Sequence, residues 1–100
     1  MNIKEKILKT IKEVSFPEQN IVQIEFELPK GFTAKELADA TREQIADIIR
    51  KNITFGKTVR LYGRMTTGMT AMLGHELAHV AKAVEIFDPK ENCFYRVIEH

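Results

Sequence analysis

The sequence lacks most features that would direct it to a membrane or to secretion. It has a single cysteine, Cys93, so an internal disulfide is excluded and a reducing compartment is expected. No apolar run approaches the roughly 20 residues that cross a bilayer. Residues 1–14 also lack the uninterrupted apolar core of a signal peptide. We therefore expect a cytoplasmic protein with no membrane partner.

An excess of one charge is missing as well. The chain has 15 Lys and Arg residues against 14 Asp and Glu residues, for a net charge of +1. Binding to long nucleic acid requires a basic face that neutralises many phosphates, so this function class is disfavoured, whereas a small anion needs only a few local groups. A length of 100 residues with 44% hydrophobic content predicts one domain over residues 1–100. The modest core of such a chain favours a homo-oligomer.

Hydrophobic periodicity assigns elements to the first half of the chain. Residues 1–14 place apolar side chains at helical spacing, which predicts an amphipathic helix, with a strand as the alternative. Alternation over residues 22–28 predicts a half-buried strand. Thr33 followed by Glu36 predicts a capping box, which starts a helix that reaches about Asn52.

The second half continues this alternation. We expect strands at residues 58–62, 83–87 and 93–98, a helix over residues 69–82, and a turn at residues 88–92 that makes the last two strands a hairpin. Strands that alternate with helices imply right-handed crossovers. The predicted fold is therefore a small single-domain α/β protein, with a mostly parallel Rossmann-like sheet, crossover helices and a C-terminal antiparallel strand.

A loop that joins a strand to a helix is the first candidate binding site. Gly63, Arg64, Thr66, Thr67 and Gly68 offer backbone N–H groups, hydroxyls and one guanidinium to an anion. Ligands of such sheets gather outside the carboxyl ends of the strands, where this loop lies. Turn glycines and capping threonines are also ordinary in loops, so the residues alone leave both interpretations open.

The string HELAH in the second helix is the first candidate catalytic motif. His75 and His79 share one helix face, as in zinc proteases, where Zn²⁺ binds both histidines and a glutamate, here Glu76, polarises water. The candidates for a third ligand are Asp88, Glu91, Glu99 and His100. None has an extended zincin spacing, and the helix leads within a few residues into a strand, as a crossover helix does. A zinc hydrolase is therefore the alternative.

A second catalytic arrangement pairs His79 with Asp88, which ends the following strand. The two could meet across a crevice or across a subunit interface, where they would suit phosphodiester cleavage. Histidine can move a proton near neutral pH, and the aspartate can orient it or hold a divalent cation. A helical histidine and an Asp-Pro turn also have ordinary structural roles.

The segment from residue 22 to residue 98 resembles the small CRISPR-associated ring nucleases of the Csx-three type. The features that carry the resemblance are the strand VQIEFEL, the strand end Gly63-Arg64, the helix with His79, and the strand AVEIFDP with the final strand after it. No single one of these motifs is diagnostic, so spacing carries most of the likeness.

The resemblance implies cleavage of cyclic tetra-adenylate, which ends the antiviral signal of type III CRISPR systems. It implies a homodimer or tetramer that holds the messenger between dimers, and Mn²⁺ as the metal. His79 and Asp88 would be the catalytic and metal-binding residues. Gly63 and Arg64 would form the phosphate-facing loop, and Lys90 would be the basic residue after the Asp-Pro pair.

The chain departs from the family pattern in the loop and in the helix. Residues 65–68 read Met-Thr-Thr-Gly where the family has a glycine and a proline, and Val80 replaces a second histidine. These departures would also suit a module that binds the cyclic nucleotide without cutting it, which is the other alternative.

Overall fold

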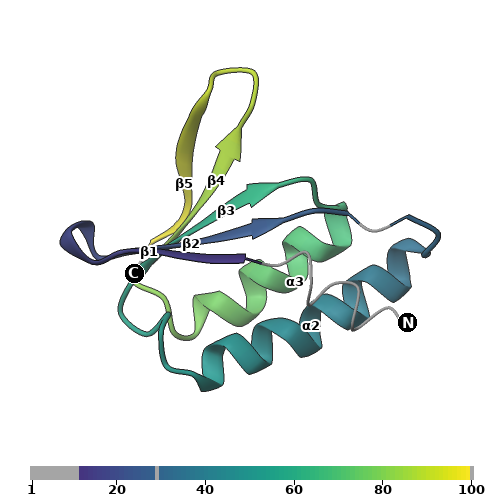
Figure 1. Cartoon of the computed structure of the whole chain (residues 1–100), viewed down its shortest axis with the longest axis horizontal. Coiled ribbons are helices and arrows are strands. Elements are labelled where there is room, and N and C mark those ends of the chain that lie inside the picture. Colours follow the sequence, from purple (N-terminus) through teal and green to yellow (C-terminus); the bar gives the residue numbers. More distant parts are fainter. Residues whose placement is uncertain (1–11, 29, 100) are drawn as a thin grey trace.

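The computed structural model describes residues 12–28 and 30–99. Within this part, a five-stranded mixed sheet carries two α-helices on one face (Figure 1). The strands, in their spatial order, are β1 (Lys12–Phe16), β2 (Ile21–Phe26), β3 (Thr58–Gly63), β4 (Ala83–Asp88) and β5 (Cys93–Glu99). The helices are α2 (Ala34–Arg50) and α3 (Thr67–Ala78), and a 3₁₀ helix (Pro17–Gln19) joins β1 to β2.

Strand pairing follows the chain without a reversal. β2, β3 and β4 are parallel neighbours, and β1 and β5 pair antiparallel at the two edges. Both crossovers advance across the sheet in the same direction, so right-handed connections place α2 and α3 on the same face. The α/β class, the crossover helices and the C-terminal hairpin are confirmed. The mostly parallel Rossmann-like sheet is not found, because half the pairings are antiparallel and no point of the strand order reverses to open a crevice.

The amino-terminal prediction is only partly covered. Residues 1–11 of the predicted helix lie outside the described residues, and residues 12–14 belong to β1, as the strand alternative had it. Pro17 opens the 3₁₀ helix between β1 and β2, and Asn20 ends it with a φ of 59°. The Asn20 N–H donates a hydrogen bond to the Pro17 carbonyl oxygen, at a distance of 3.2 Å.

Side-chain caps set the start of both helices. In α2, the Thr33 hydroxyl accepts from the Glu36 amide at 3.1 Å and the Glu36 carboxylate accepts from the Thr33 amide at 2.9 Å, which confirms the capping box. In α3, the Thr66 hydroxyl accepts from the Met69 amide at 3.2 Å. The helix therefore begins at Thr67, slightly earlier than the sequence predicted.

The end of α3 differs more from the prediction. The helix ends at Ala78, whereas the sequence predicted about Lys82. The Val80 carbonyl accepts from the Gly56 amide at 2.9 Å, and the Lys82 amide donates to the Lys57 carbonyl at 2.8 Å. These bonds join the chain to the loop before β3 and compete with further helical turns.

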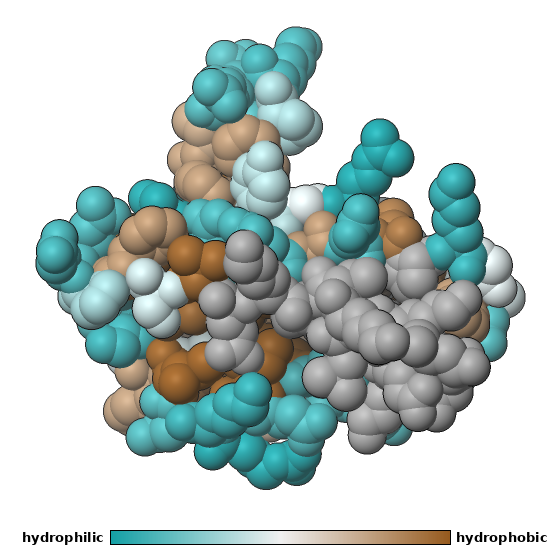
Figure 2. Space-filling model, in the orientation of Figure 1, coloured by the Kyte–Doolittle hydropathy of each residue, from teal (hydrophilic) through white to brown (hydrophobic). Residues whose placement is uncertain are grey.

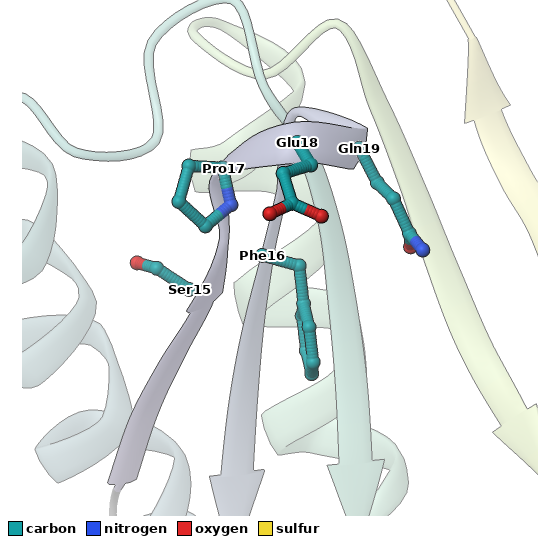
Figure 3. A pocket seen from close by; sticks show the side chains of 5 residues that line it. All are labelled: Ser15, Phe16, Pro17, Glu18 and Gln19. Carbon is teal, nitrogen blue, oxygen red and sulfur yellow. The ribbon is translucent and has the colours of Figure 1, made fainter.

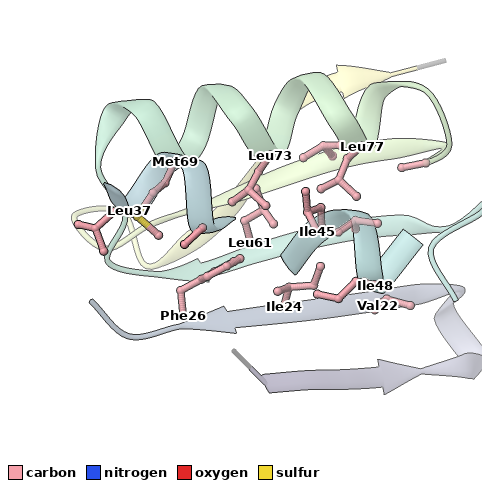
Figure 4. Close-up of a cluster of buried hydrophobic side chains, with 14 residues drawn as sticks. Val22, Ile24, Phe26, Leu37, Ile45, Ile48, Leu61, Met69, Leu73 and Leu77 are labelled. Atoms are coloured by element: carbon pink, nitrogen blue, oxygen red, sulfur yellow. The ribbon is translucent and has the colours of Figure 1, made fainter. Parts of the chain in front are cut away.

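The core lies between the helices and the sheet. Ile24 and Leu61 of the sheet face Ile45 of α2 and Leu73 and Leu77 of α3, and each is at most 1% exposed (Figure 4). Each such side chain contributes roughly 1.5–3 kcal/mol on burial. No helix in the described part is long and apolar enough to span a membrane.

The opposite face of the sheet carries an ion-pair network. Glu85 accepts from Arg60 at 2.9 Å and from Arg96 at 3.1 Å, and the Arg60 guanidinium lies 4.7 Å from the centre of the Phe94 ring. Burial of Glu85 acts to raise its pKa, but the hydrogen bonds from the two arginines outweigh burial and hold the pKa below its ordinary value. This face therefore carries charged side chains that are paired with one another.

The β4–β5 hairpin projects beyond the rest of the sheet (Figure 1). Its base is braced by rings, because Phe87 lies 4.8 Å from Tyr62 and 5.2 Å from Phe94 between ring centres. Figure 2 shows that the tip of this projection is hydrophilic and that apolar side chains lie below it. The aromatic contacts hold the hairpin to β3 where backbone pairing has ended.

Candidate functional site

Three parallel strands finish at one edge of the sheet, here called the carboxyl edge. β2 ends there at Phe26, β3 at Gly63 and β4 at Asp88. Both helices begin at this edge, since each follows one of these strands and runs back along the sheet. Helix amino termini carry partial positive charge, so the carboxyl edge is electrostatically suited to an anion.

An open cavity of about 740 Å³ lies at the carboxyl edge, beside the ends of β2 and β3. Its described lining consists of Phe26, Glu27, Leu28, Lys30, Gly31, Phe32, Gly63 and Arg64. Gly63 and Arg64 are thus where the sequence placed them, at a strand end beside a hollow. Lys30 and Arg64 supply positive charge, Glu27 supplies one carboxylate, and the remaining side chains are apolar.

Gly63 is required by its pairing with Phe26. It has a φ of 122°, a conformation that side chains rarely adopt, and a β-carbon built on it would overlap the Phe26 carbonyl oxygen. The backbones of β2 and β3 therefore approach closely at the end of the sheet. Arg64 leaves the sheet directly after this point and lines the cavity.

The rest of the predicted anion loop forms the start of α3. The Thr66 hydroxyl is already engaged by the Met69 amide, so its role is that of a cap. Thr67 and Gly68 are exposed in the first turn, and among the described residues their amides have no partner. These three residues are not among the described residues that line the cavity, although only Met65 separates them from Arg64.

Asp88 and Lys90 lie on the projecting hairpin. The Asp88 carboxylate accepts from the Lys90 amide at 2.9 Å and from the Glu91 amide at 3.4 Å, so it holds the turn between β4 and β5. Asp88 is half-buried and Lys90 is exposed. Neither is among the described residues that line the cavity, although both lie toward the carboxyl edge.

The two histidines of HELAH are adjacent on the surface. Their rings are 5.2 Å apart between centres and meet edge to face, and both side chains are exposed. His75 lies in the last turn of α3, whereas His79 follows the last helical residue. Among residues 12–28 and 30–99, no three His, Cys, Asp or Glu side chains form a group that could hold a metal ion.

His79 and Asp88 lie at opposite ends of the parallel strands, and Asp88 is at the carboxyl edge. His79 follows the end of α3, close to where β4 begins at Ala83, and Asp88 is the last residue of β4. A strand rises roughly 3.3 Å per residue, which separates the two edges by roughly 17 Å. A single chain therefore does not bring the predicted pair together, and only its form across a subunit interface is compatible with this arrangement.

A smaller hollow of about 180 Å³ lies at the turn between β1 and β2. Its described lining comes from one continuous segment, residues 15–19, whose side chains are shown in Figure 3. The segment offers one carboxylate, Glu18, and no cationic or nucleophilic partner for it beyond the Ser15 hydroxyl. We assign it no chemistry.

Sequence reasoning missed the part of the larger cavity that follows β2. Glu27, Lys30 and Phe32 line it, and all three come between the end of β2 and the start of α2. A signal for them was present, because Lys30 and Gly31 follow a predicted strand just as Gly63 and Arg64 do.

Comparison with known proteins adds no assignment. No protein-family model matches the chain, and no curated protein matches it significantly.

Proposed function

We propose that this protein is a homo-oligomeric ring nuclease that binds cyclic tetra-adenylate and cleaves it, which would end a type III CRISPR antiviral signal. The observation that carries the proposal is the cavity at the carboxyl edge, lined by Gly63 and Arg64 at the end of β3. These are the residues to which the resemblance assigns the phosphate-facing loop. The rest of the proposal follows from the chemistry available around them.

The cavity suits a nucleotide in size and in charge. A volume of about 740 Å³ falls in the range of small-molecule sites, which is roughly 300–1,000 Å³. Arg64 offers a planar guanidinium that can donate two parallel hydrogen bonds to a phosphate. The exposed residues Thr67 and Gly68, whose amides lie at the positive end of α3, come three and four residues after Arg64.

The proposed reaction is in-line attack of a ribose 2′-hydroxyl on the neighbouring phosphate. The 2′-oxygen forms a bond to phosphorus, the bond from phosphorus to the 5′-oxygen breaks, and His79 accepts the hydroxyl proton. The departing 5′-oxygen takes a proton from water. Arg64 stabilises the negative charge that grows on the phosphate. Alignment of hydroxyl, phosphate and leaving oxygen alone contributes several kcal/mol.

Two copies would be needed for this reaction. Within one chain, Arg64 lies at the carboxyl ends of the parallel strands and His79 lies near their amino ends. A ring bound at the carboxyl edge of one copy would therefore meet His79 of another copy. A messenger held between dimers, as the resemblance implies, satisfies this requirement. A divalent ion such as Mn²⁺ favours carboxylate oxygen, which Asp88 would supply, and it would supply charge stabilisation. His79 would then keep a free ring nitrogen to accept the hydroxyl proton.

Specific observations favour each of the two alternatives. Asp88 already holds a hairpin turn through two amides, which suits a module that binds the ring without cutting it. The edge-to-face contact of His75 and His79 suits a shared Zn²⁺ ion, as in a zinc hydrolase. The zinc hydrolase needs a third metal ligand from another copy or from His100.

The test is incubation of the purified protein with cyclic tetra-adenylate, with Mn²⁺ or with a chelator, and separation of the products by chromatography. Ring nuclease activity predicts linear di-adenylates in the wild type and in His75→Ala, and an intact ring in His79→Ala. A ring that stays intact with the wild-type protein under every condition would reject the proposal. Equal loss in both histidine variants would instead support the zinc site.

A further inference from the structure

We propose that the segment between β2 and α2 forms a base-recognition subsite of the carboxyl-edge cavity, which holds one adenosine monophosphate unit. In this subsite the base packs on Leu28 and Phe32, the phosphate lies between Lys30 and Arg64, and Glu27 accepts a hydrogen bond from the exocyclic amino group. The choice of adenine rests on the proposed function. The subsite itself rests on the lining of the cavity.

The apolar wall of the subsite is anchored by the core. Phe26 is buried, and Leu28 and Phe32 are half-buried and pack against the core cluster. Each also lines the cavity, so one side of these side chains is fixed and another faces the hollow. A wall that is already ordered costs little conformational entropy when a flat base packs on it.

The charged groups of the cavity are available to a ligand. Lys30, Arg64 and Glu27 are exposed, and within the described residues none of them forms an ion pair or a hydrogen bond. Elsewhere on the surface, by contrast, Lys35 pairs with Asp39 at 2.8 Å. Two such cations in the lining of one hollow suit the negative charge of a phosphate group.

The backbone between β2 and α2 brings Lys30 to this position. Gly31 has a φ of 90°, which turns the chain from the end of β2 toward the cap of α2 at Thr33. No atom lies within 4 Å of a β-carbon built on Gly31, which also lines the cavity, so the space beside this turn is open. The carboxylate of Glu27 lies before this turn and the ammonium group of Lys30 lies within it, so the two can contact different ends of one nucleotide.

Glu27 gives the subsite its specificity. A carboxylate only accepts hydrogen bonds, so it favours the amino group of adenine and repels the carbonyl oxygen that hypoxanthine carries at the same position. Adenosine and inosine monophosphates differ in this group and at N1, which carries a hydrogen only in hypoxanthine. A preference for adenosine monophosphate that depends on Glu27 therefore reports contact of its carboxylate with the amino group.

The experiment is calorimetric titration of the full chain with adenosine monophosphate and with inosine monophosphate. We expect Lys30→Ala to weaken adenosine monophosphate binding about tenfold or more, as loss of a charge-assisted hydrogen bond does. We expect Glu27→Gln to reduce the preference for adenosine over inosine monophosphate. Lys35→Ala, a matched exposed lysine on α2, should leave both affinities unchanged. Thermal unfolding of each variant checks that the fold is retained.

The outcomes separate the subsite from the nuclease. Wild-type protein that binds neither monophosphate at millimolar concentration overturns the subsite, as does equal binding by wild type and Lys30→Ala. Binding that depends on Lys30, in a protein that leaves the cyclic ring intact, supports the subsite and rejects the nuclease. Cleavage of the ring with the same KM in wild type, Lys30→Ala and Glu27→Gln supports the nuclease and rejects the subsite.

Discussion

Gly63 lies so close to Phe26 in the parallel pairing of β3 with β2 that no side chain fits between them. The contact occurs at the last residue of each strand, where the sheet opens into the cavity. The two strand ends therefore reach the cavity together, and Glu27 and Arg64, which follow them directly, both line it. A backbone contact of the fold thus sets the geometry of the candidate site.

The first prediction concerns this contact. Gly63→Ala should lower the free energy of unfolding by about 3 kcal/mol or more, because overlap with the Phe26 carbonyl adds to the strain of an unfavourable φ. Gly56→Ala is the matched control. Its φ is also positive, at 70°, but nothing lies within 4 Å of an added β-carbon, so about 1 kcal/mol is expected. Urea denaturation of the variants checks both values, and equal losses would contradict the overlap.

Local sequence signals were sufficient for the elements that local interactions determine. The capping box of Thr33 and Glu36 lies within one turn, and the alternation of β2 lies within one strand, so both could be predicted from a few residues. The end of α3 could not. The end of this helix depends on hydrogen bonds that join Val80 and Lys82 to Gly56 and Lys57 in the loop before β3. These partners are distant in the sequence, so a pattern of neighbouring residues does not reveal them.

The candidate site was predictable to a similar extent. The rule that ligands gather at strand ends found Gly63 and Arg64, and it could also have found Lys30. The relative position of His79 and Asp88 depends on the direction of α3 along the sheet. Residue spacing along the chain, which left open a meeting across a crevice or across a subunit interface, does not give that direction.

The second prediction uses the separation of these two residues. If catalysis joins His79 of one copy to Asp88 of another, then His79→Ala and Asp88→Ala should each be inactive alone. An equal mixture, allowed to exchange subunits, should regain about a quarter of the wild-type rate, because that share of sites combines two intact residues. Cleavage of cyclic tetra-adenylate by the mixture is the measurement. A mixture that stays inactive despite proven exchange would contradict a shared site.

The third prediction concerns zinc. The rings of His75 and His79 touch on an exposed surface, so two imidazoles can bind Zn²⁺ weakly even if the protein is a nuclease. We expect micromolar or weaker affinity, lost about equally in His75→Ala and His79→Ala, with cleavage of the ring unaffected in His75→Ala. Competition with a zinc-sensitive dye measures the affinity. Zinc that copurifies in equal amount with the protein would instead support a hydrolase.

The last prediction follows from Glu85 and its two arginines on the helix-free face of the sheet. Its carboxylate is 13% exposed and its pKa lies below the ordinary value of 4.5, because hydrogen bonds from Arg60 and Arg96 outweigh the effect of burial. The folded state therefore binds this proton more weakly than the unfolded chain does. The resulting stabilisation is fully present above pH 4.5 and is lost as the pH falls through the lowered pKa.

Glu85→Gln should accordingly be less stable than wild type by about 1–2 kcal/mol at about pH 7, and the difference should shrink toward about pH 3. Glu18→Gln removes an exposed carboxylate that has no ion pair within the described residues, and it should stay within about 0.5 kcal/mol of wild type at both pH values. Urea denaturation across this range is the measurement. A constant difference between wild type and Glu85→Gln would show that packing of the Glu85 side chain stabilises the fold and that its charge does not, because only the charge titrates in this interval.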